Sequence, residues 1–148
     1  MNWFLAALSK YAEFQGRARR KEYWYFALFT CIIGVALLLA GVALASLMGR
    51  GRSGDEILAG PVSIPFFLFC LAILIPALAV TVRRLHDTGR SGGWYFIGFV
   101  PFVGHILLFI FTLLDSTPGQ NEYGPNPKGV PGYGPPVPLY PPPQYPAI

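Results

Sequence analysis

The sequence predicts an all-α membrane protein with an interfacial amphipathic helix at its N-terminus, three transmembrane helices and a disordered proline-rich C-terminal tail. Three observations predict this class. Only 12% of the 148 residues are charged, whereas soluble domains average about 25%. Long uncharged runs alternate with short polar segments. The last 34 residues, from Asp115 onward, include eleven prolines and five glycines, a composition that does not build a packed core.

The N-terminal residues 2–14 predict an amphipathic helix. Phe4, Leu8 and Tyr11 recur at helical spacing, and Ser9 falls on another face. Thirteen residues are too few to cross a bilayer, which takes about 20. We therefore expect this helix to lie in the membrane interface; a cytosolic helix packed on the loops is the alternative. Because no basic segment precedes the apolar residues, we expect no cleavable signal.

Three apolar runs predict the transmembrane helices. Residues 23–48 form 26 uncharged residues that begin with an aromatic cluster. They give about 39 Å of helix at 1.5 Å per residue, more than the ~30 Å hydrocarbon core requires. The second and third runs are residues 62–82 and 94–114, and each contains an internal proline, Pro76 and Pro101. We expect these prolines to kink or distort their helices.

The distribution of basic residues predicts the orientation. Three crossings place the N-terminal arm and the polar segment 83–94 on one side, and the connector 49–60 and the tail on the other. The first side then holds eight of the eleven Lys and Arg residues. The positive-inside rule puts that side in the cytoplasm and the tail outside. If Pro101 and Gly104 instead mark a re-entrant hairpin, the tail returns to the cytoplasm.

Three motifs carry a family resemblance. They are F-x-G-R-x-x-R-x-E-Y-W from residue 14, R-R-L-H-D-T-G-x-S from residue 83 followed by Trp94, and T-P-G-x-N-x-Y-G-P-x-P from residue 117. In this order they resemble the small bacterial inner-membrane proteins of the domain of unknown function 805 (DUF805) family. The resemblance covers residues 1–128 and implies a multi-pass plasma-membrane protein, but it supplies no catalytic residue or cofactor. Residues 129–148 are an extension that we expect to be disordered and dispensable for folding.

Catalytic patterns are weak in this sequence. Residues 89–93 fit G-x-S-x-G around Ser91, but a nucleophile elbow needs a strand and a sheet. His105 is 14 residues away along one predicted helix, about 21 Å, and a base must approach its nucleophile to about 3 Å. His105 lies at a depth where an ionisable residue suggests function; a neutral histidine bonded to a neighbouring helix is the alternative. We expect no enzyme activity.

Metal and cofactor patterns are also weak. His86 and Asp87 are two adjacent potential ligands without a second cluster, and structural metal sites need about four. Cys31 and Cys70 fall inside apolar runs, where cysteine behaves as a small apolar residue. We therefore expect no metal and no cofactor.

The leading functional prediction is a non-enzymatic membrane protein whose cytoplasmic basic face binds anionic lipid headgroups or a partner protein. Arginine suits phosphate because it donates two parallel hydrogen bonds; the alternative is that these charges only set topology. A small oligomeric transporter or channel is the alternative function, and no nucleic-acid partner is expected. The candidate binding residues are Arg17, Arg19, Arg20, Lys21, Glu22, Arg83, Arg84, His86, Asp87 and Arg90.

Overall fold

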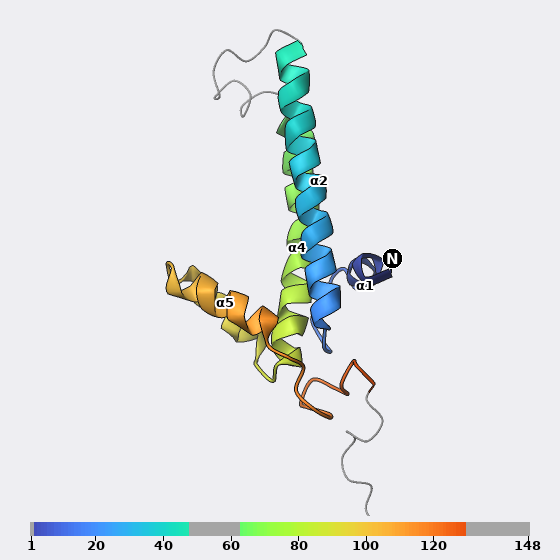
Figure 1. The fold of residues 1–148 in the computed structure, drawn as a ribbon, viewed down its shortest axis with the longest axis vertical. Coiled ribbons are helices and arrows are strands. Elements are labelled where there is room, and N and C mark those ends of the chain that lie inside the picture. The colour runs from blue at the N-terminus through green and yellow to red at the C-terminus, as the bar shows by residue number, and fades with distance from the viewer. Residues whose placement is uncertain (1, 48–62, 130–148) are drawn as a thin grey trace, which may run out of the picture.

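The computed structural model describes residues 2–47 and 63–129 of the chain. Regular structure in these residues is helical, apart from an isolated bridge between Asn121 and Gly124, so the all-α prediction is confirmed for them. Two long helices run side by side, and shorter helices lie across them near one end (Figure 1). In chain order the helices are α1 (Asn2–Ser9), α2 (Arg20–Leu47), α4 (Ile64–Asp87), the 3-10 helix η2 (Gly92–Phe99) and α5 (Val103–Leu113).

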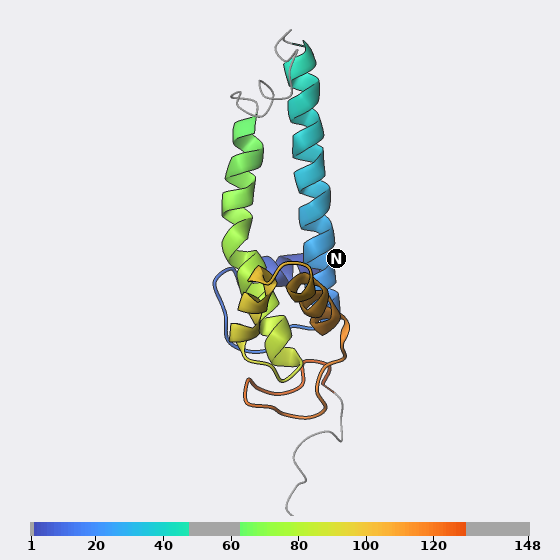
Figure 2. The same ribbon diagram turned by 90° about the vertical axis from the view of Figure 1, so that its left-hand side faces the viewer.

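Helices α2 and α4 form the long axis of the molecule (Figures 1 and 2). Their most apolar stretches have mean hydropathies of 2.6 in the 28-residue α2 and 2.5 in the 24-residue α4. At about 1.5 Å per residue both exceed the ~30 Å hydrocarbon core. Residues 23–47 of the first predicted run (23–48) and 64–82 of the second (62–82) therefore fall in helices that are long and apolar enough to cross a membrane.

Helix α4 extends five residues past the predicted end of the second run at Val82. Residues 83–87, expected in a loop, complete the helix. Gly89 follows with φ +73°, a left-handed conformation that favours glycine. It closes the helix with a Schellman motif, in which the Arg90 N–H donates to the Leu85 carbonyl at 3.0 Å. The charged motif is thus held on a rigid helix end.

The prediction of one continuous span over residues 94–114 is wrong. Helices η2 and α5 reverse direction around Pro101 and pack against each other, and we call this pair the η2–α5 hairpin (Figure 1). Pro101 lacks the N–H that a continuous helix requires, and Phe102 takes φ +60°. A Cβ on Gly104 would lie 1.8 Å from the Ile97 carbonyl oxygen, so only glycine permits this approach. Each arm is too short to span a bilayer.

The hairpin returns the chain to the end from which α2 begins. Residues 114–129 run below the end of α4, where the Thr117 N–H donates to the Asp87 carbonyl at 2.9 Å (Figure 2). The N-terminal arm and this part of the tail therefore lie at the same end of the α2–α4 pair, contrary to the three-crossing arrangement. Residues 130–148 of the expected disordered tail lie outside the described residues.

Helix α1 packs against the base of α2 and α4 on the side opposite the hairpin (Figure 1). It is shorter than the predicted 2–14 helix. Its Phe4 ring lies 5.9 Å from the Phe26 ring, measured between centroids. Ala7, Phe26 and Val80 belong to the small buried core at this point. The core therefore sits where the short helices cross the long ones.

Candidate functional site

The last turn of α4 buries charged side chains, which proteins do only when the charges are paired. Arg83, Arg84 and Asp87 are each 0% exposed. Arg17 of the N-terminal arm and Glu22 of α2 are also buried. We call these five residues the ionic cluster.

Asp87 is the centre of the ionic cluster. Its carboxylate accepts a hydrogen bond from Arg17 Nε at 2.9 Å and is also bound by Arg84 Nη1. Ser116 Oγ donates to the same carboxylate at 2.6 Å. One negative charge therefore lies between two guanidinium groups and is held from three parts of the chain: the N-terminal arm, α4 and the residues that follow α5.

Arg17 ties the N-terminal arm to residues 117–124. Its guanidinium donates to the carbonyl oxygens of Thr117 at 2.7 Å, Gly119 at 2.9 Å and Gly124 at 3.3 Å. Gly16, which precedes it, has φ +84° and so turns the arm in a conformation that favours glycine. This one side chain organises the start of the tail.

Arg84 ties the arm to the hairpin. It donates to the carbonyl oxygens of Ala18 at 3.3 Å and Thr112 at 3.2 Å, and also to that of Leu114. Together with the bond to Asp87, these contacts use the planar, multiply donating geometry of a guanidinium.

Arg83 ties α4 to α2. Its Nη1 lies 2.6 Å from Glu22 Oε1, and its own carbonyl accepts the Ala18 N–H at 3.0 Å. Its Nε and Nη2 have no hydrogen-bond partner within the described residues. The pair is therefore only partly satisfied by the chain.

His86 contributes packing and a hydrogen bond. Its ring stacks on Tyr123 with centroids 3.8 Å apart and planes 3° from parallel. Its Nδ1 lies 3.2 Å from the Gly16 carbonyl oxygen, and its own carbonyl accepts from Asn121 Nδ2 at 2.9 Å. No group of three or more metal-ligating side chains occurs in the part of the chain that the structure describes.

The other predicted site residues surround the ionic cluster at the surface. Arg19 lies over the Trp3 ring at 5.6 Å, and Arg90 lies over the Phe111 ring at 4.1 Å. Arg20 donates to the Leu114 carbonyl at 2.7 Å. These three arginines, Lys21 and two further lysines that were not among the predicted site residues form the basic rim. The basic rim is defined as Lys10, Arg19, Arg20, Lys21, Arg90 and Lys128.

The structure brings all ten predicted site residues to one end of the molecule, but it divides them into a buried and an exposed set. Sequence reasoning missed most of the acceptors, such as the carbonyls of Thr112, Leu114 and Gly119, because a backbone acceptor leaves no side-chain signature. The motif that begins at residue 117 was the one sequence feature that could have indicated that this segment contributes acceptors to the site. Lys128 binds Asp115, and this hydrogen bond holds the pKa of the Asp115 carboxyl below its ordinary value.

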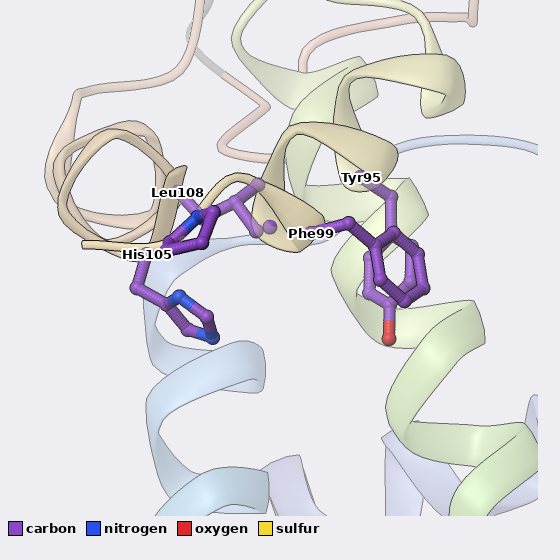
Figure 3. A pocket seen from close by; sticks show the side chains of 6 residues that line it. Tyr95, Phe99, His105 and Leu108 are labelled. Atoms are coloured by element: carbon purple, nitrogen blue, oxygen red, sulfur yellow. The ribbon is translucent and has the colours of Figure 1, made fainter. Parts of the chain in front are cut away.

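The two residues considered for catalysis, Ser91 and His105, are not members of the ionic cluster. Ser91 is exposed and immediately precedes η2. His105 is exposed on α5 and lines a hollow of about 570 Å³ in the hairpin (Figure 3). The other lining residues are Tyr95, Gly98, Phe99, Pro101 and Leu108.

Comparison with known proteins identifies the family. The family model described as "Protein of unknown function (DUF805)" matches residues 11–125. The Escherichia coli (strain K12) inner membrane protein YhaI is 39% identical over 130 residues, which are 86% of this chain and 97% of that protein. Inner membrane protein YhaH of the same strain is 39% identical over 128 residues, with 86% and 98% covered. The uncharacterized protein YiiR is 31% identical over 145 residues, with 80% and 88% covered.

No solved structure matches the chain. The family match includes the first two motifs and the third as far as Pro125, and these motifs supply the ionic cluster and its partners. Two of the relatives are named as inner membrane proteins, in agreement with the two long apolar helices. The chain therefore belongs to the DUF805 family, and it is a membrane protein.

Proposed function

We propose that this chain is a multi-pass protein of the bacterial inner membrane that crosses twice, through α2 and α4. The names of the relatives and the length of both helices support this arrangement. The basic residues support its orientation. Nine of the eleven belong to the arm, the end of α4 and the residues that follow, and only Arg50 and Arg52 belong to the connector between α2 and α4. Two crossings thus give a nine-to-two split, with the nine on the cytoplasmic side.

In this arrangement α1 and the η2–α5 hairpin lie at the cytoplasmic interface. Both cross the long helices at nearly the same height (Figure 1). The hairpin exposes large apolar side chains, with Phe102 85% and Phe99 77% exposed. Contiguous exposed apolar surface of this kind marks a membrane or protein contact. Membrane lipid at this height would cover it.

The basic rim is proposed to bind anionic headgroups. The observation that carries this is the charge at the cytoplasmic end: six exposed or half-exposed cations face only three exposed carboxylates, namely Glu13, Asp115 and Glu122. Basic groups near an anionic surface are attracted by about 1 kcal/mol each. The ionic cluster contributes little to this attraction because its cations are buried and paired.

The ionic cluster is proposed to hold the fold together, with no part in catalysis. Its arginines donate to the arm, α2, the hairpin and residues 117–124. This separates the predicted site into two roles. Buried arginines fix the end of the molecule, and the basic rim meets the membrane.

Lipid selectivity tests the proposal. Lys10 and Lys21 are exposed, so the variant Lys10→Gln/Lys21→Gln should fold normally. In nanodiscs that mix anionic and zwitterionic phospholipid, its preference for anionic lipid should fall roughly 10- to 30-fold, from the loss of about 2 kcal/mol. The preference should also weaken as salt is raised.

Arg50→Gln/Arg52→Gln is the matched control, because it removes the same charge from the other end of the membrane-spanning pair. It should leave lipid preference at the cytoplasmic leaflet unchanged. An equal effect of the two double variants, or no effect of either, would exclude the basic rim as the lipid contact.

A reporter fusion tests the topology. Fused after Gly129, a reporter active only in the cytoplasm should be active, because two crossings return the chain to its starting side. Activity of a periplasmic reporter at the same position would contradict the two-crossing arrangement.

A further inference from the structure

The η2–α5 hairpin contains a preformed hollow. Its volume is about 570 Å³, within the ~300–1,000 Å³ range of ligand sites. Its walls come from both arms and from the turn at Pro101 (Figure 3). Gly98 and Gly104 permit these walls to form, since a Cβ on Gly98 would lie 2.8 Å from Leu108 Cδ1. The two arms are therefore fixed at a close spacing that larger residues would widen.

Two polar side chains line this otherwise apolar hollow. The Tyr95 hydroxyl and the His105 imidazole extend to the same side of the hairpin (Figure 3). Neither has a hydrogen-bond partner in the part of the chain that the structure describes. Phe99, Pro101 and Leu108 supply the remaining side-chain surface. An occupant would thus need an apolar body and hydrogen-bonding oxygen atoms near one another.

We propose that this hollow binds one membrane phospholipid. An acyl chain would lie against Phe99, Pro101 and Leu108, and ester or phosphate oxygens would accept hydrogen bonds from Tyr95 Oη and a ring N–H of His105. The inference rests on the hairpin lying at the membrane interface, as proposed above. At that height phospholipid is the abundant molecule that combines both chemistries.

The position of the hairpin favours a lipid over a protein occupant. It projects from the α2–α4 pair on the side away from α1 (Figure 1), and its surroundings are apolar, with Phe96 and Ile106 exposed beside the hollow. The lining carries no charged side chain that would select a partner protein. A lipid satisfies the two unpartnered polar groups without adding a charge.

Photolabelling tests this site. The full chain in neutral detergent would be titrated with a phosphatidylcholine that carries a photoactivatable group in its acyl chain, and the adducts would be mapped by mass spectrometry. We expect saturable labelling within residues 95–108 that unlabelled phosphatidylcholine displaces. Leu108→Trp, which fills the hollow, should reduce labelling there at least about fivefold, equivalent to about 1 kcal/mol.

Ile106→Trp is the matched control, because it adds the same bulk to the same helix outside the hollow. It should label as the wild type does. Tyr95→Phe/His105→Phe removes both polar groups while keeping an aromatic ring at each position, and it should weaken labelling about tenfold, from the loss of two hydrogen bonds. If Leu108→Trp does not fold, the labelling of the Tyr95→Phe/His105→Phe variant tests the proposed site instead.

Three results would overturn the inference. They are labelling that does not saturate, labelling spread evenly over the apolar faces of α2 and α4, and equal labelling of the Leu108 and Ile106 variants. The Lys10→Gln/Lys21→Gln variant should label as the wild type, because this assay uses no anionic lipid. Failure of the hollow and failure of the basic rim are therefore distinguishable.

Discussion

Replacing Asp87 by asparagine should destabilise the whole end of the molecule at which α4 finishes. The aspartate and asparagine side chains are nearly identical in size, so the substitution removes the charge and keeps the shape of the side chain. Asp87 is 0% exposed and lies between the guanidinium groups of Arg17 and Arg84. In the variant, two buried cations would face a neutral amide whose own N–H groups are donors.

The magnitude follows from the cost of leaving a buried charge unpaired. Breaking one partner of a buried ion pair typically costs about 3–5 kcal/mol. For a chain of about 150 residues, each kcal/mol corresponds to roughly 2–4 °C in thermal midpoint. Asp87→Asn should therefore lower the midpoint by roughly 6–20 °C.

Thermal unfolding of the detergent-solubilised protein, followed by circular dichroism, measures this loss. Asp115→Asn is the matched control. Its carboxylate also contacts a lysine and an arginine but is 59% exposed, and an exposed ion pair contributes about 0–1 kcal/mol. A double-mutant cycle with Arg17→Gln should show coupling to Asp87, because the two side chains share a hydrogen bond.

Equal midpoints for the Asp87 and Asp115 variants would refute this reasoning. So would additivity of Arg17→Gln and Asp87→Asn, since independent effects mean that the two side chains do not interact. Either result would mean that pairing with Asp87 contributes no more to stability than an exposed ion pair does.

Four further outcomes are expected. Arg84→Lys should cost about 2 kcal/mol or more in thermal unfolding, although charge is kept, because an ammonium cannot reach all of the acceptors that the guanidinium binds. Gly104→Ala should cost about 1–3 kcal/mol or more in the same assay, because its methyl group would overlap a carbonyl oxygen of η2. Truncation after Gly129 should leave the thermal midpoint unchanged, because so proline-rich a segment buries little apolar surface. The lowered pKa of Asp115 means that its bond to Lys128 stabilises residues 115–128 above the ordinary pKa of 3.8 and is lost as the pH falls through the folded value; hydrogen-exchange protection factors there, taken relative to the intrinsic rate at each pH, should fall on acidification, and less so in Lys128→Gln.

The sequence was sufficient to predict the two long helices and insufficient to predict the hairpin. Length and apolarity decide whether a segment can span a bilayer, and both are properties of a local window. The reversal at Pro101 depends on contact between residues that are not adjacent in sequence, above all Gly104 against the Ile97 carbonyl. Pro101 and Gly104 pointed to a re-entrant hairpin as an alternative, but one apolar run of 21 residues fits a crossing equally well by composition.

The sequence predicted where the candidate site residues lie better than it predicted whether they are buried. Charge and motif placed Arg17, Arg83, Arg84 and Asp87 at one end, and the structure brings them there. Their burial was not predictable, because it depends on residues 114–124 covering the end of α4. A basic segment beside an apolar run is ordinarily solvated, and only the tertiary contacts show that these three arginines are enclosed.

The location of the ionic cluster explains why the family resemblance lies in the polar segments. Only 6% of the most apolar stretch of α2, and 17% of that of α4, is buried within the described chain, so internal packing does little to place these helices. Lipid accepts almost any apolar side chain at such positions. The end of the molecule is different, because each guanidinium there must meet particular acceptors at hydrogen-bonding distance. Arg17 from the first motif, Asp87 from the second and Thr117 from the third meet within this single network. The relative position of α2 and α4 is therefore fixed mainly from one end, by residues whose hydrogen-bonding geometry a similar side chain would not reproduce.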